Sequence, residues 1–464
     1  MEIENKTFDE INIGDKAFFT KKLNEKDIEV FARMSGDFNP LHVDEEFAKE
    51  SIFHQRVAHG MWGGGLISTV LGTKLPGPGA IYLRQTLQFK KPVFIGDELR
   101  AEVEVKSKDE EKKRIIFSCQ LTNQEKELVV TGEAEVIAPT KKIKRKLSHL
   151  KEVEVIETGK KHEALIEKAK KIDKRFSMGI VFPTTEDTLL GAIEAAEAGL
   201  ISPIFIGPEK KMKEIAKDLA RDISSYHCID VEDDEKSIEK AISLVHEKEV
   251  DALMKGSLHT DVFIKKVISA KEGLRTDRKV SHCAVVDIPT HEKLLIFTDG
   301  AINILPTIQI KKDMIINAID LAHAMDIPTP HVAILSATET ILENIPSTLE
   351  AAILCKMAER GQIKGGIVDG PLAFDVAISL ASAHTKHLVS EVAGQPDIFI
   401  FPNIESGNIS IKALELLAYA EYAGVVLGAK VPIVLTSRSA PAKERLISSA
   451  LAKIYFYWHQ NTKE

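Results

Sequence analysis

The stretch VAHGMWGGGLISTVLGTKL, residues 57–75, decides the architecture of the first part of this 464-residue chain. Lys74 is its only charged residue, so a helix over this stretch is apolar all round and must be buried on every side. Downstream, three runs alternate apolar and polar residues, at residues 99–106, 115–121 and 128–136. This alternation indicates strands with one buried face, and the short polar connections between them indicate hairpins. The two patterns together predict an antiparallel meander wrapped around one buried helix.

The charge pattern changes beyond residue 140. Residues 141–146 read KKIKRK, and a segment rich in Lys and Glu follows to about residue 160. This composition favours a solvated linker over a nucleic-acid or lipid patch. The sequence therefore predicts a first domain at residues 1–140, a charged linker at 141–160 and a second domain at 161–464.

The second domain alternates apolar strand candidates with helical patterns. The strand candidates lie at residues 178–182, 203–207, 252–256, 284–288, 331–336, 365–370, 397–402 and 432–437. Helical patterns lie between them at residues 185–199, 236–247, 314–325 and 348–360. Continuous apolar strands interleaved with helices predict an α/β domain with a parallel sheet covered on both faces. At about 300 residues this domain is expected to split into two subdomains with a cleft.

Composition excludes several classes of function. The formal net charge of -8 argues against broad nucleic-acid binding, which needs a basic surface. The sequence has no uninterrupted run of about 18 apolar residues, so no membrane span is expected. The acidic, polar N-terminal segment does not predict a signal peptide. Four widely spaced cysteines indicate isolated thiols in a reducing cytoplasm, not disulfides or a zinc site.

The segment SGDFNPLHVDEEFA, residues 35–48, carries a candidate acid–base pair. A turn at Asn39-Pro40 can bring Asp37 and His42 toward one point, and a carboxylate beside an imidazole suits general acid–base catalysis. His59 and Gly60 open the apolar helix, so the Gly60 amide is expected at a helix N-terminus, where negative charge is favoured. The residue types alone also fit Asp37 as a turn cap and His42 as a structural histidine.

The GDFNPLHVD segment and the following AHGM resemble the signature of the MaoC-like (R)-specific enoyl-CoA hydratases, a hot-dog fold, over residues 10–138. The resemblance implies an α+β hot-dog domain in which Asp37 and His42 hold the catalytic water. It also implies that Gly60 binds the thioester carbonyl, that Asn39 orients the pair and that His59 contributes to substrate binding. The alternative is a hot-dog domain that binds acyl-CoA without hydrating it.

Small polar and basic clusters follow several strands of the second domain. They are Lys255-Gly256-Ser257, Asp369-Gly370-Pro371 and Ser437-Arg438-Ser439. Ligands of open α/β sheets bind beyond the carboxyl ends of the strands, where these clusters are expected. The chain lacks GxxxxGK[ST], and no GxGxxG follows a strand, so the usual marks of nucleotide binding are missing. Each cluster alone also fits ordinary turn chemistry.

Taken in order, several segments resemble the phosphate acetyl/butyryltransferase family, from about residue 161 to the C-terminus. They are MKGSLHTDVFIKKV, GLRTDRKVSH, FTDGAIN, GGIVDGPLAFDVAIS, DIFIFPNIESGNI and VLTSRSAP, and LMKGSLHT and GLRT lean toward the butyryltransferase branch. The family exchanges acyl-CoA plus phosphate for acyl phosphate plus CoA, without a metal or an organic cofactor.

The resemblance implies roles for individual residues of the second domain. Arg438 is expected to hold phosphate and the reacting carbonyl, because a guanidinium binds such oxygens with two donors. Ser437 is expected to hydrogen-bond the CoA sulfur or the tetrahedral intermediate. Glu444, seven residues after Ser437, falls at the position of the family's base. Further candidates for substrate binding are Lys255, Ser257, Lys265, Arg275 and Asp369, and the charged ones among them also fit a solvated surface.

The sequence thus predicts a cytoplasmic bifunctional enzyme acting on short acyl-CoAs of about four carbons. Its expected ligands are acyl-CoA, CoA, phosphate and acyl phosphate, with no nucleic acid and no membrane. Both modules resemble families that dimerise, so a homo-oligomer is expected. The alternative is one active module joined to a non-catalytic acyl-CoA-binding regulatory module.

Overall fold

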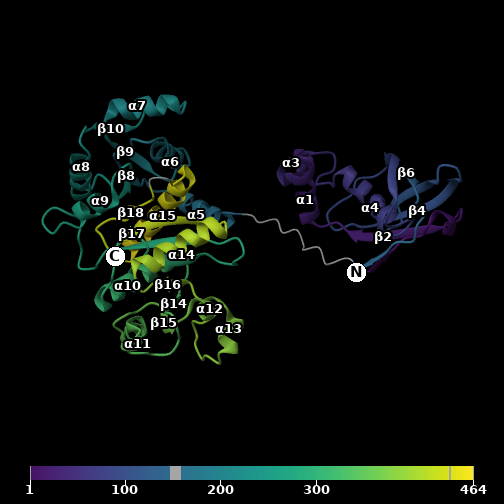
Figure 1. The fold of residues 1–464 in the computed structure, drawn as a ribbon. Coiled ribbons are helices and arrows are strands. Elements are labelled where there is room, and N and C mark those ends of the chain that lie inside the picture. Colours follow the sequence, from purple (N-terminus) through teal and green to yellow (C-terminus); the bar gives the residue numbers. More distant parts are fainter. Residues whose placement is uncertain (1, 147–157, 438–439, 463–464) are drawn as a thin grey trace. The chain divides into compact units, whose positions relative to one another are not determined.

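The chain folds into two compact units, residues 1–155 and 156–464 (Figure 1). The computed structural model describes residues 2–146, 158–437 and 440–462. None of the helices within these ranges is long and apolar enough to cross a membrane.

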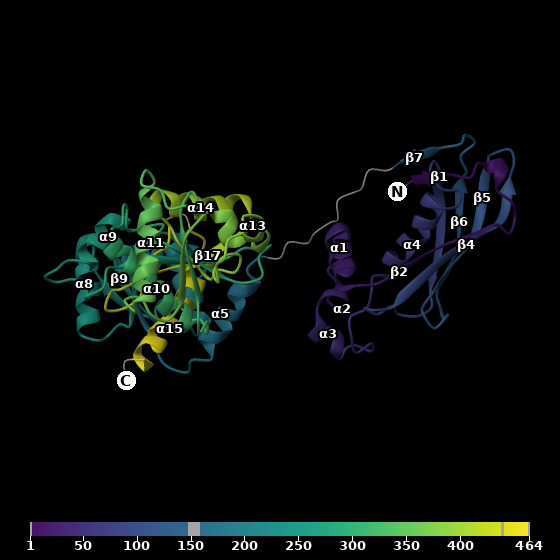
Figure 2. The ribbon, with the colours of Figure 1, turned by 90° about the horizontal axis from the view of Figure 1, so that it is seen from below.

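The first unit is built on a five-stranded antiparallel sheet. In spatial order its strands are β2 (Lys16–Lys22), β4 (Glu98–Asp109), β5 (Arg114–Thr122), β6 (Leu128–Ile137) and β3 (Ile81–Phe89). Alternate residues of β4 and β5 are buried, as their period-two pattern predicts. Helix α4 (Gly60–Thr73) lies against one face of this sheet, with Leu66, Ile67 and Val70 buried (Figure 2). The predicted meander around one apolar helix is confirmed.

Two glycines of α4 let the helix approach the sheet closely. A Cβ on Gly63 would lie 3.0 Å from Leu121 Cδ2, and one on Gly64 would lie 3.0 Å from Leu87 Cδ1. Both contacts are tighter than ordinary van der Waals packing, so a side chain at either position would require the leucine to shift. The glycine run therefore serves helix–sheet packing at two of its three positions.

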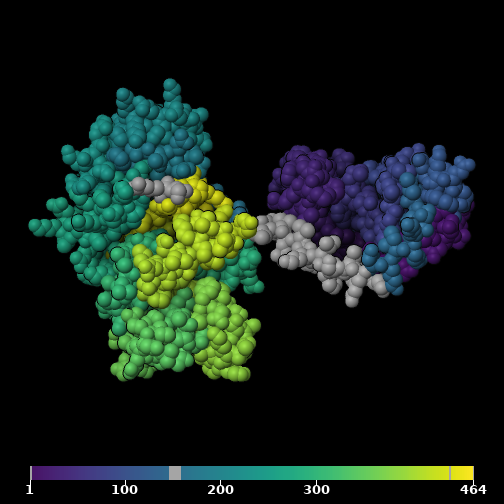
Figure 3. Space-filling view, viewed as in Figure 1, coloured from purple at the N-terminus to yellow at the C-terminus, as the bar shows by residue number. Residues whose placement is uncertain are grey.

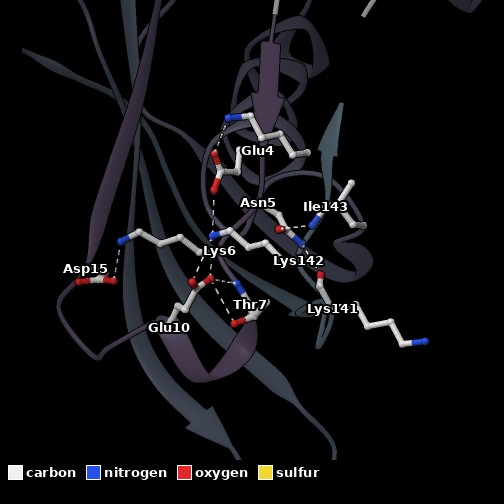
Figure 4. A network of polar contacts seen from close by, with 10 residues as sticks. Glu4, Asn5, Lys6, Thr7, Glu10, Asp15, Lys141, Lys142 and Ile143 are labelled. Atoms are coloured by element: carbon white, nitrogen blue, oxygen red, sulfur yellow. Dashed lines mark hydrogen bonds and ion pairs between the residues drawn. The ribbon is translucent and has the colours of Figure 1, made fainter. Parts of the chain in front are cut away.

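The N-terminal part of the predicted linker belongs to the first unit. Strand β7 (Lys144–Lys146) pairs antiparallel with β1 (Glu2–Glu4). The Asn5 side chain accepts the Ile143 N–H at 2.9 Å and donates to the Lys141 carbonyl at 2.9 Å (Figure 4). Lys142 forms ion pairs with Glu4 and Glu10, which neutralise part of the basic run (Figure 4).

These contacts extend the first unit beyond the predicted boundary at residue 140, because β7 pairs with β1 and Lys142 pairs with acidic residues of the same unit. Residues 147–157 of the predicted linker lie outside the described residues. Helix α5 (Lys160–Lys170) begins at the predicted end of the linker.

Four further helical elements lie within the described residues of the first unit. They are η1 (Phe8–Glu10), α1 (Glu25–Ser35), α2 (Pro40–Val43) and α3 (Glu45–Glu50).

The second unit contains an eleven-stranded sheet. In spatial order its strands are β10 (His227–Asp230), β9 (Ser202–Gly207), β8 (Ser177–Val181), β11 (Ala252–Lys255), β18 (Ile433–Val434), β17 (Glu421–Leu427), β12 (Ser281–Asp287), β13 (Leu295–Thr298), β16 (Ile398–Ile400), β14 (His331–Leu335) and β15 (Ile367–Leu372). The predicted strand segments all correspond to strands of this sheet, with shifted ends.

The sheet is mixed, which corrects the prediction of a parallel sheet. The five strands from β10 to β18 are parallel to one another, as are the four from β13 to β15. Between these blocks, β17 pairs antiparallel with both β18 and β12, and β12 pairs antiparallel with β13. Short connections explain the pairings of β12 with β13 and of β17 with β18, because each pair is consecutive in the chain and short loops join antiparallel neighbours. The two parallel blocks consequently run in opposite directions.

Helices cover both faces of the sheet. One apolar core lies beneath α5, α6 (Glu186–Glu197), α7 (Glu209–Asp218), α10 (Ile308–Ala324), α11 (Pro346–Glu359) and α15 (Ala442–Asn461). The opposite face carries two separate cores. One lies beneath α8 (Asp234–His246) and α9 (Thr260–Val267), and the other beneath α12 (Phe374–Ile378), α13 (Leu380–Thr385) and α14 (Ile404–Leu417).

These two cores correspond to the two predicted subdomains. Figure 3 shows teal residues on one side of the second unit and green residues on the other, with yellow C-terminal residues between them.

Candidate active sites

A short turn places Asp37 and His42 beside one another. Helix α1 ends at Ser35, and Asp37 Oδ1 accepts the Asn39 backbone N–H at 3.2 Å. Asn39 caps α2 by accepting the Leu41 N–H at 3.1 Å, and Pro40 occupies the first turn of that helix. His42 lies on α2, where its Nδ1 is 2.8 Å from the Val57 carbonyl. Asn39 thus shapes the turn that brings the predicted pair together.

His59 joins this pair from the start of α4. Its ring lies 3.9 Å from the His42 ring, centroid to centroid, and 4.9 Å from that of Phe31. Its Nε2 is 3.0 Å from the Asp37 carbonyl oxygen. Only 3% of His59 is exposed, and this burial lowers the pKa of its imidazole. The structure therefore assembles a three-residue cluster of Asp37, His42 and His59.

An apolar cavity of about 350 Å³ opens beside this cluster. His59 and Gly60 line it at the start of α4, together with Phe89 from the end of β3. The remaining lining residues are Phe53, Val57, Ala58, Trp62, Gly63, Lys90, Lys91, Pro92, Val93, Leu121, Val129 and Val130. A cavity of this composition suits a short acyl chain, and the Gly60 amide at the helix N-terminus suits a carbonyl oxygen that gains negative charge.

A second cavity, of about 770 Å³, lies on the sheet face between the two subdomain cores. Thr260 lines it from α9, Asn408 and Lys412 line it from α14, and His282 and Tyr422 line it from β12 and β17. The rest of its lining comprises Gly300, Ala301, Ile404, Glu405, Ile409, Ile411, Leu435, Thr436 and Ser437. Segments after β13, β16 and β18 contribute to it, so it lies near strand ends, as predicted.

Ser437 is an exposed residue of this second cavity. Its backbone carbonyl accepts a hydrogen bond of 2.9 Å from Arg445 Nη2, and Arg445 Nη1 donates to the Ala440 carbonyl. Arg445 is completely buried and lies in the first turn of α15. It therefore ties the Ser437 segment to a buried helix. Arg438, the predicted phosphate ligand, lies outside the described residues.

Glu444 does not line the cavity that contains Ser437. It lies in an adjoining space of about 140 Å³, and Tyr422 lines both spaces. Glu444 is 6% exposed, and its burial raises the pKa of its carboxyl to about 7. A hydrogen bond from the Tyr422 hydroxyl lowers the same pKa, but the effect of burial is larger. Burial also raises the pKa of Tyr422, so its phenol stays protonated. A carboxyl with this pKa suits proton transfer near neutral pH.

The other predicted substrate-binding residues have different surroundings. Lys255 is 1% exposed and donates to the Gly256 and Leu258 carbonyls at 3.2 Å each, so the alternative of a solvated surface charge is wrong for it. Ser257 accepts the Thr184 N–H at 3.1 Å.

None of the five residues Lys255, Ser257, Lys265, Arg275 and Asp369 is among the lining residues of the second cavity. Lys265 and Arg275 are exposed. Asp369 lies in the edge strand β15, where its carboxylate accepts the Gly370 N–H at 2.8 Å.

Three residues of the second site were not predicted. His282 and Tyr422 line the cavity from antiparallel strands, and Arg445 holds the Ser437 segment. Burial lowers the pKa of His282, and its backbone N–H donates to the Asp299 carboxylate at 3.2 Å. The motifs GLRTDRKVSH and FTDGAIN contain His282 and Asp299, so this contact had a sequence signal. Tyr422 and Arg445 had none.

The chain therefore carries two separate catalytic-type sites, an acid–base cluster beside an apolar cavity and a polar cavity in a mixed α/β sheet. The profile described as "MaoC like domain" matches residues 11–127, and that described as "Phosphate acetyl/butaryl transferase" matches residues 235–453. An R-hydratase from Pseudomonas aeruginosa, solved unliganded, shares 42% sequence identity, with a TM-score of 0.33, over 33% of this chain and 99% of that chain.

Two curated relatives match the second unit. A phosphate acetyltransferase from Rhizobium meliloti is 49% identical over 276 residues, 60% of this chain and 87% of the relative. A phosphate butyryltransferase from Clostridium acetobutylicum is 38% identical over 269 residues, 58% of this chain and 89% of the relative. The chain belongs to the phosphate acetyl/butyryl transferase family and carries a MaoC-like domain in its first unit. These identities do not favour the butyryltransferase branch that the LMKGSLHT and GLRT segments indicated.

Proposed function

We propose that the chain is a bifunctional enzyme of short-chain acyl-CoA metabolism. The first unit adds water to an enoyl-CoA to give the (R)-3-hydroxyacyl-CoA. The second unit exchanges an acetyl or butyryl group between CoA and inorganic phosphate. The observation that carries the proposal is that each unit pairs a cavity with polar groups of the matching chemistry. These groups are Asp37, His42 and Gly60 in the first unit, and Ser437 with Tyr422 and Glu444 in the second.

In the hydratase reaction, the acyl chain occupies the apolar cavity and the thioester oxygen accepts the Gly60 N–H. Asp37 and the acceptor nitrogen of His42 hold one water molecule. As the water oxygen bonds to C3 of the enoyl group, Asp37 takes a proton from it, and negative charge moves to the thioester oxygen. The pair then returns a proton to C2, which completes the addition of water.

In the transferase reaction, a phosphate oxygen attacks the thioester carbonyl directly, without a covalent enzyme intermediate. Ser437 donates a hydrogen bond to the CoA sulfur or to the tetrahedral oxyanion, and Arg438 holds the phosphate. The C–S bond then breaks and leaves a CoA thiolate, which needs a proton. Catalysis comes mainly from positioning and from the fixed charges of the site.

The proton for the thiolate comes from Glu444 through Tyr422. The Tyr422 hydroxyl gives its proton to the sulfur and receives one from the protonated Glu444 carboxyl. In the reverse direction the same two groups carry the thiol proton away. The arrangement in which Tyr422 lines both spaces supports this route over direct contact between Glu444 and the substrate.

We also propose that the enzyme is a cytoplasmic homo-oligomer. Four free cysteines fit a reducing compartment. Edge strand β3 pairs only with β6 in the described sheet, and Ile81, Tyr82, Leu83 and Phe89 are exposed along it. An exposed apolar edge strand favours pairing with another chain, and a second copy offers the same strand in a symmetric arrangement.

The test measures both activities on the same chain. Phosphate-dependent release of CoA from acetyl-CoA and butyryl-CoA is followed beside hydration of crotonyl-CoA. Ser437→Ala and Arg438→Ala are expected to abolish only the transferase, and Asp37→Asn only the hydratase. In each variant the activity that remains shows that the chain is still folded. A wild-type chain that binds CoA but shows only one activity would overturn the bifunctional proposal.

A further inference from the structure

The hydrogen bonds of His42 and His59 leave two acceptor nitrogens beside a carboxylate. A carbonyl oxygen only accepts hydrogen bonds, so His42 Nδ1, 2.8 Å from the Val57 carbonyl, carries a proton. His59 Nε2, 3.0 Å from the Asp37 carbonyl, carries one for the same reason. In the neutral rings the remaining nitrogens, His42 Nε2 and His59 Nδ1, are therefore lone-pair acceptors.

The three side chains of the cluster lie close together. One ligand atom each from Asp37, His42 and His59 fall within 4.8 Å of one another. His59 is 97% buried, and its Nδ1 has no hydrogen-bond partner among the described residues. Within this cluster the three side chains offer acceptors and no free donor. A buried acceptor without a partner costs free energy, so the cluster favours a ligand that is a donor or a cation.

We propose that Asp37, His42 and His59 bind one divalent transition-metal cation, with Zn²⁺ as the reference ion, and that the bound cation replaces the catalytic water and stops hydration. A water molecule has two hydrogens and satisfies two of the three acceptors, whereas a cation satisfies all three. Two imidazoles and a carboxylate are a donor set that Zn²⁺ uses in proteins, with further positions left open.

The surroundings of the cluster fit such a site. Each histidine donates its second ring N–H to a backbone carbonyl, the arrangement that orients imidazole ligands in metal sites. Tetrahedral Zn²⁺ brings its ligand atoms to roughly 3.3 Å from one another. The cluster must therefore contract by up to about 1.5 Å from its present 4.8 Å, and the exposed Asp37 in its turn is the group that can move. The two histidines, whose rings are in contact and whose second nitrogens bond backbone carbonyls, supply the fixed side.

A bound cation would separate the two activities of the chain. It occupies the lone pairs that hold the water, and it prevents Asp37 from taking a proton. The transferase site is in the other compact unit and uses none of these residues. Inhibition by the cation rests on the proposed hydratase function, whereas binding of the cation does not.

Calorimetric titration of the full chain with Zn²⁺ tests binding. We compare wild type with His59→Gln and Asp37→Asn, and use His54→Gln as the matched control, because His54 is an exposed histidine outside the cluster. The dissociation constant of one site is expected to rise at least about tenfold in both cluster variants and to stay unchanged in the control. Mg²⁺, which prefers oxygen ligands, is not expected to compete.

Both activities are then measured on the same samples. The Zn²⁺ concentration that halves hydration is expected to match the dissociation constant, while phosphate-dependent CoA release continues. An unchanged dissociation constant in both cluster variants would overturn the proposal, as would equal inhibition of the two activities. Absence of hydration before Zn²⁺ is added would overturn the proposed hydratase, and the effect of the variants on binding would still decide the cation site.

Discussion

Tyr422 lies between Glu444 and the cavity that contains Ser437. Its side chain lines both that cavity and the small space in which Glu444 is buried, and the two side chains are in hydrogen-bonding reach. Lys412 Nζ lies 5.4 Å from the centroid of the Tyr422 ring on the cavity side. A proton moving between Glu444 and a ligand in the cavity therefore has Tyr422 in its path.

Tyr422→Phe is expected to lower the kcat of the transferase by about 10²-fold, the usual contribution of a positioned proton-transfer group. The ring still fills its place, so the fold and the KM for phosphate are expected to change little. Tyr419→Phe is the matched control, because Tyr419 is 65% exposed and lines neither space. Equal rates for wild type and Tyr422→Phe across the pH range would exclude the route through Tyr422.

The pKa of Glu444 predicts two pH dependences. Acylation of CoA needs the ionised carboxylate, so its rate is expected to rise with pH through about 7. Stability is expected to change in the opposite direction. Because the pKa is higher in the folded chain than the ordinary value of 4.5, the folded state holds the proton more tightly. The free energy of unfolding therefore falls as pH rises from about 4.5 to 7, by up to about 3 kcal/mol.

Glu444→Gln removes this titrating group and tests the stability prediction. Trp62 and Trp458 are the two tryptophans, one in each unit, so in a Trp62→Phe background the fluorescence of Trp458 reports on the second unit. Urea unfolding at pH 5 and pH 8 is expected to show a smaller loss of stability with pH in the Gln variant. A loss of the same size in both chains would contradict the burial argument.

Arg445 is expected to be required for transfer without touching the substrate. Its guanidinium donates to two carbonyls of the segment that contains Ser437, and a lysine cannot hold both in the same geometry. Arg445→Lys is therefore expected to reduce kcat and to destabilise the second unit by about 1–3 kcal/mol. The transferase rate and urea unfolding are measured, with hydration by the first unit as the internal control. The matched variant is Arg221→Lys, because Arg221 forms a surface ion pair with Glu197 and its replacement is expected to change stability by at most about 0.5 kcal/mol.

Much of the architecture could be predicted because it depends on local pattern. The apolar stretch at residues 57–75 and the period-two runs after it define the first unit, and alternating apolar strands and helices define the second. The antiparallel pairings of β12 with β13 and of β17 with β18 could not be predicted in this way. An apolar strand carries no mark of its direction, which here depends on the short loops after β12 and β17.

The two sites differ in predictability for a similar reason. Asp37, Asn39 and His42 lie within six residues, so one turn brings them together, and the turn residues are visible in the sequence. Tyr422 and Glu444 are joined by a strand and a helix whose packing determines their distance. The role of Arg445 could not be predicted for another reason, because a charged residue in the first turn of a helix is normally exposed to solvent.

Gly60 is expected to be required for hydration because of its contact with Phe89. A Cβ on residue 60 would lie 2.9 Å from Phe89 Cε1, and the Phe89 ring lines the acyl cavity. Gly60→Ala must therefore displace the ring within the site. We expect kcat/KM for crotonyl-CoA to fall about tenfold or more, with the transferase unchanged.

A double-mutant cycle and a matched glycine test this steric argument. Phe89→Leu removes the ring carbon in question, so Gly60→Ala is expected to cost much less in the Phe89→Leu background than in wild type. Gly65 lies in the same helix, and a Cβ added there would have no atom within 4 Å. Gly65→Ala is therefore expected to stabilise the chain by about 0.5–1 kcal/mol and to leave hydration intact. Equal losses from Gly60→Ala in both backgrounds would show that Gly60 acts through its backbone alone and not through the space it leaves for Phe89.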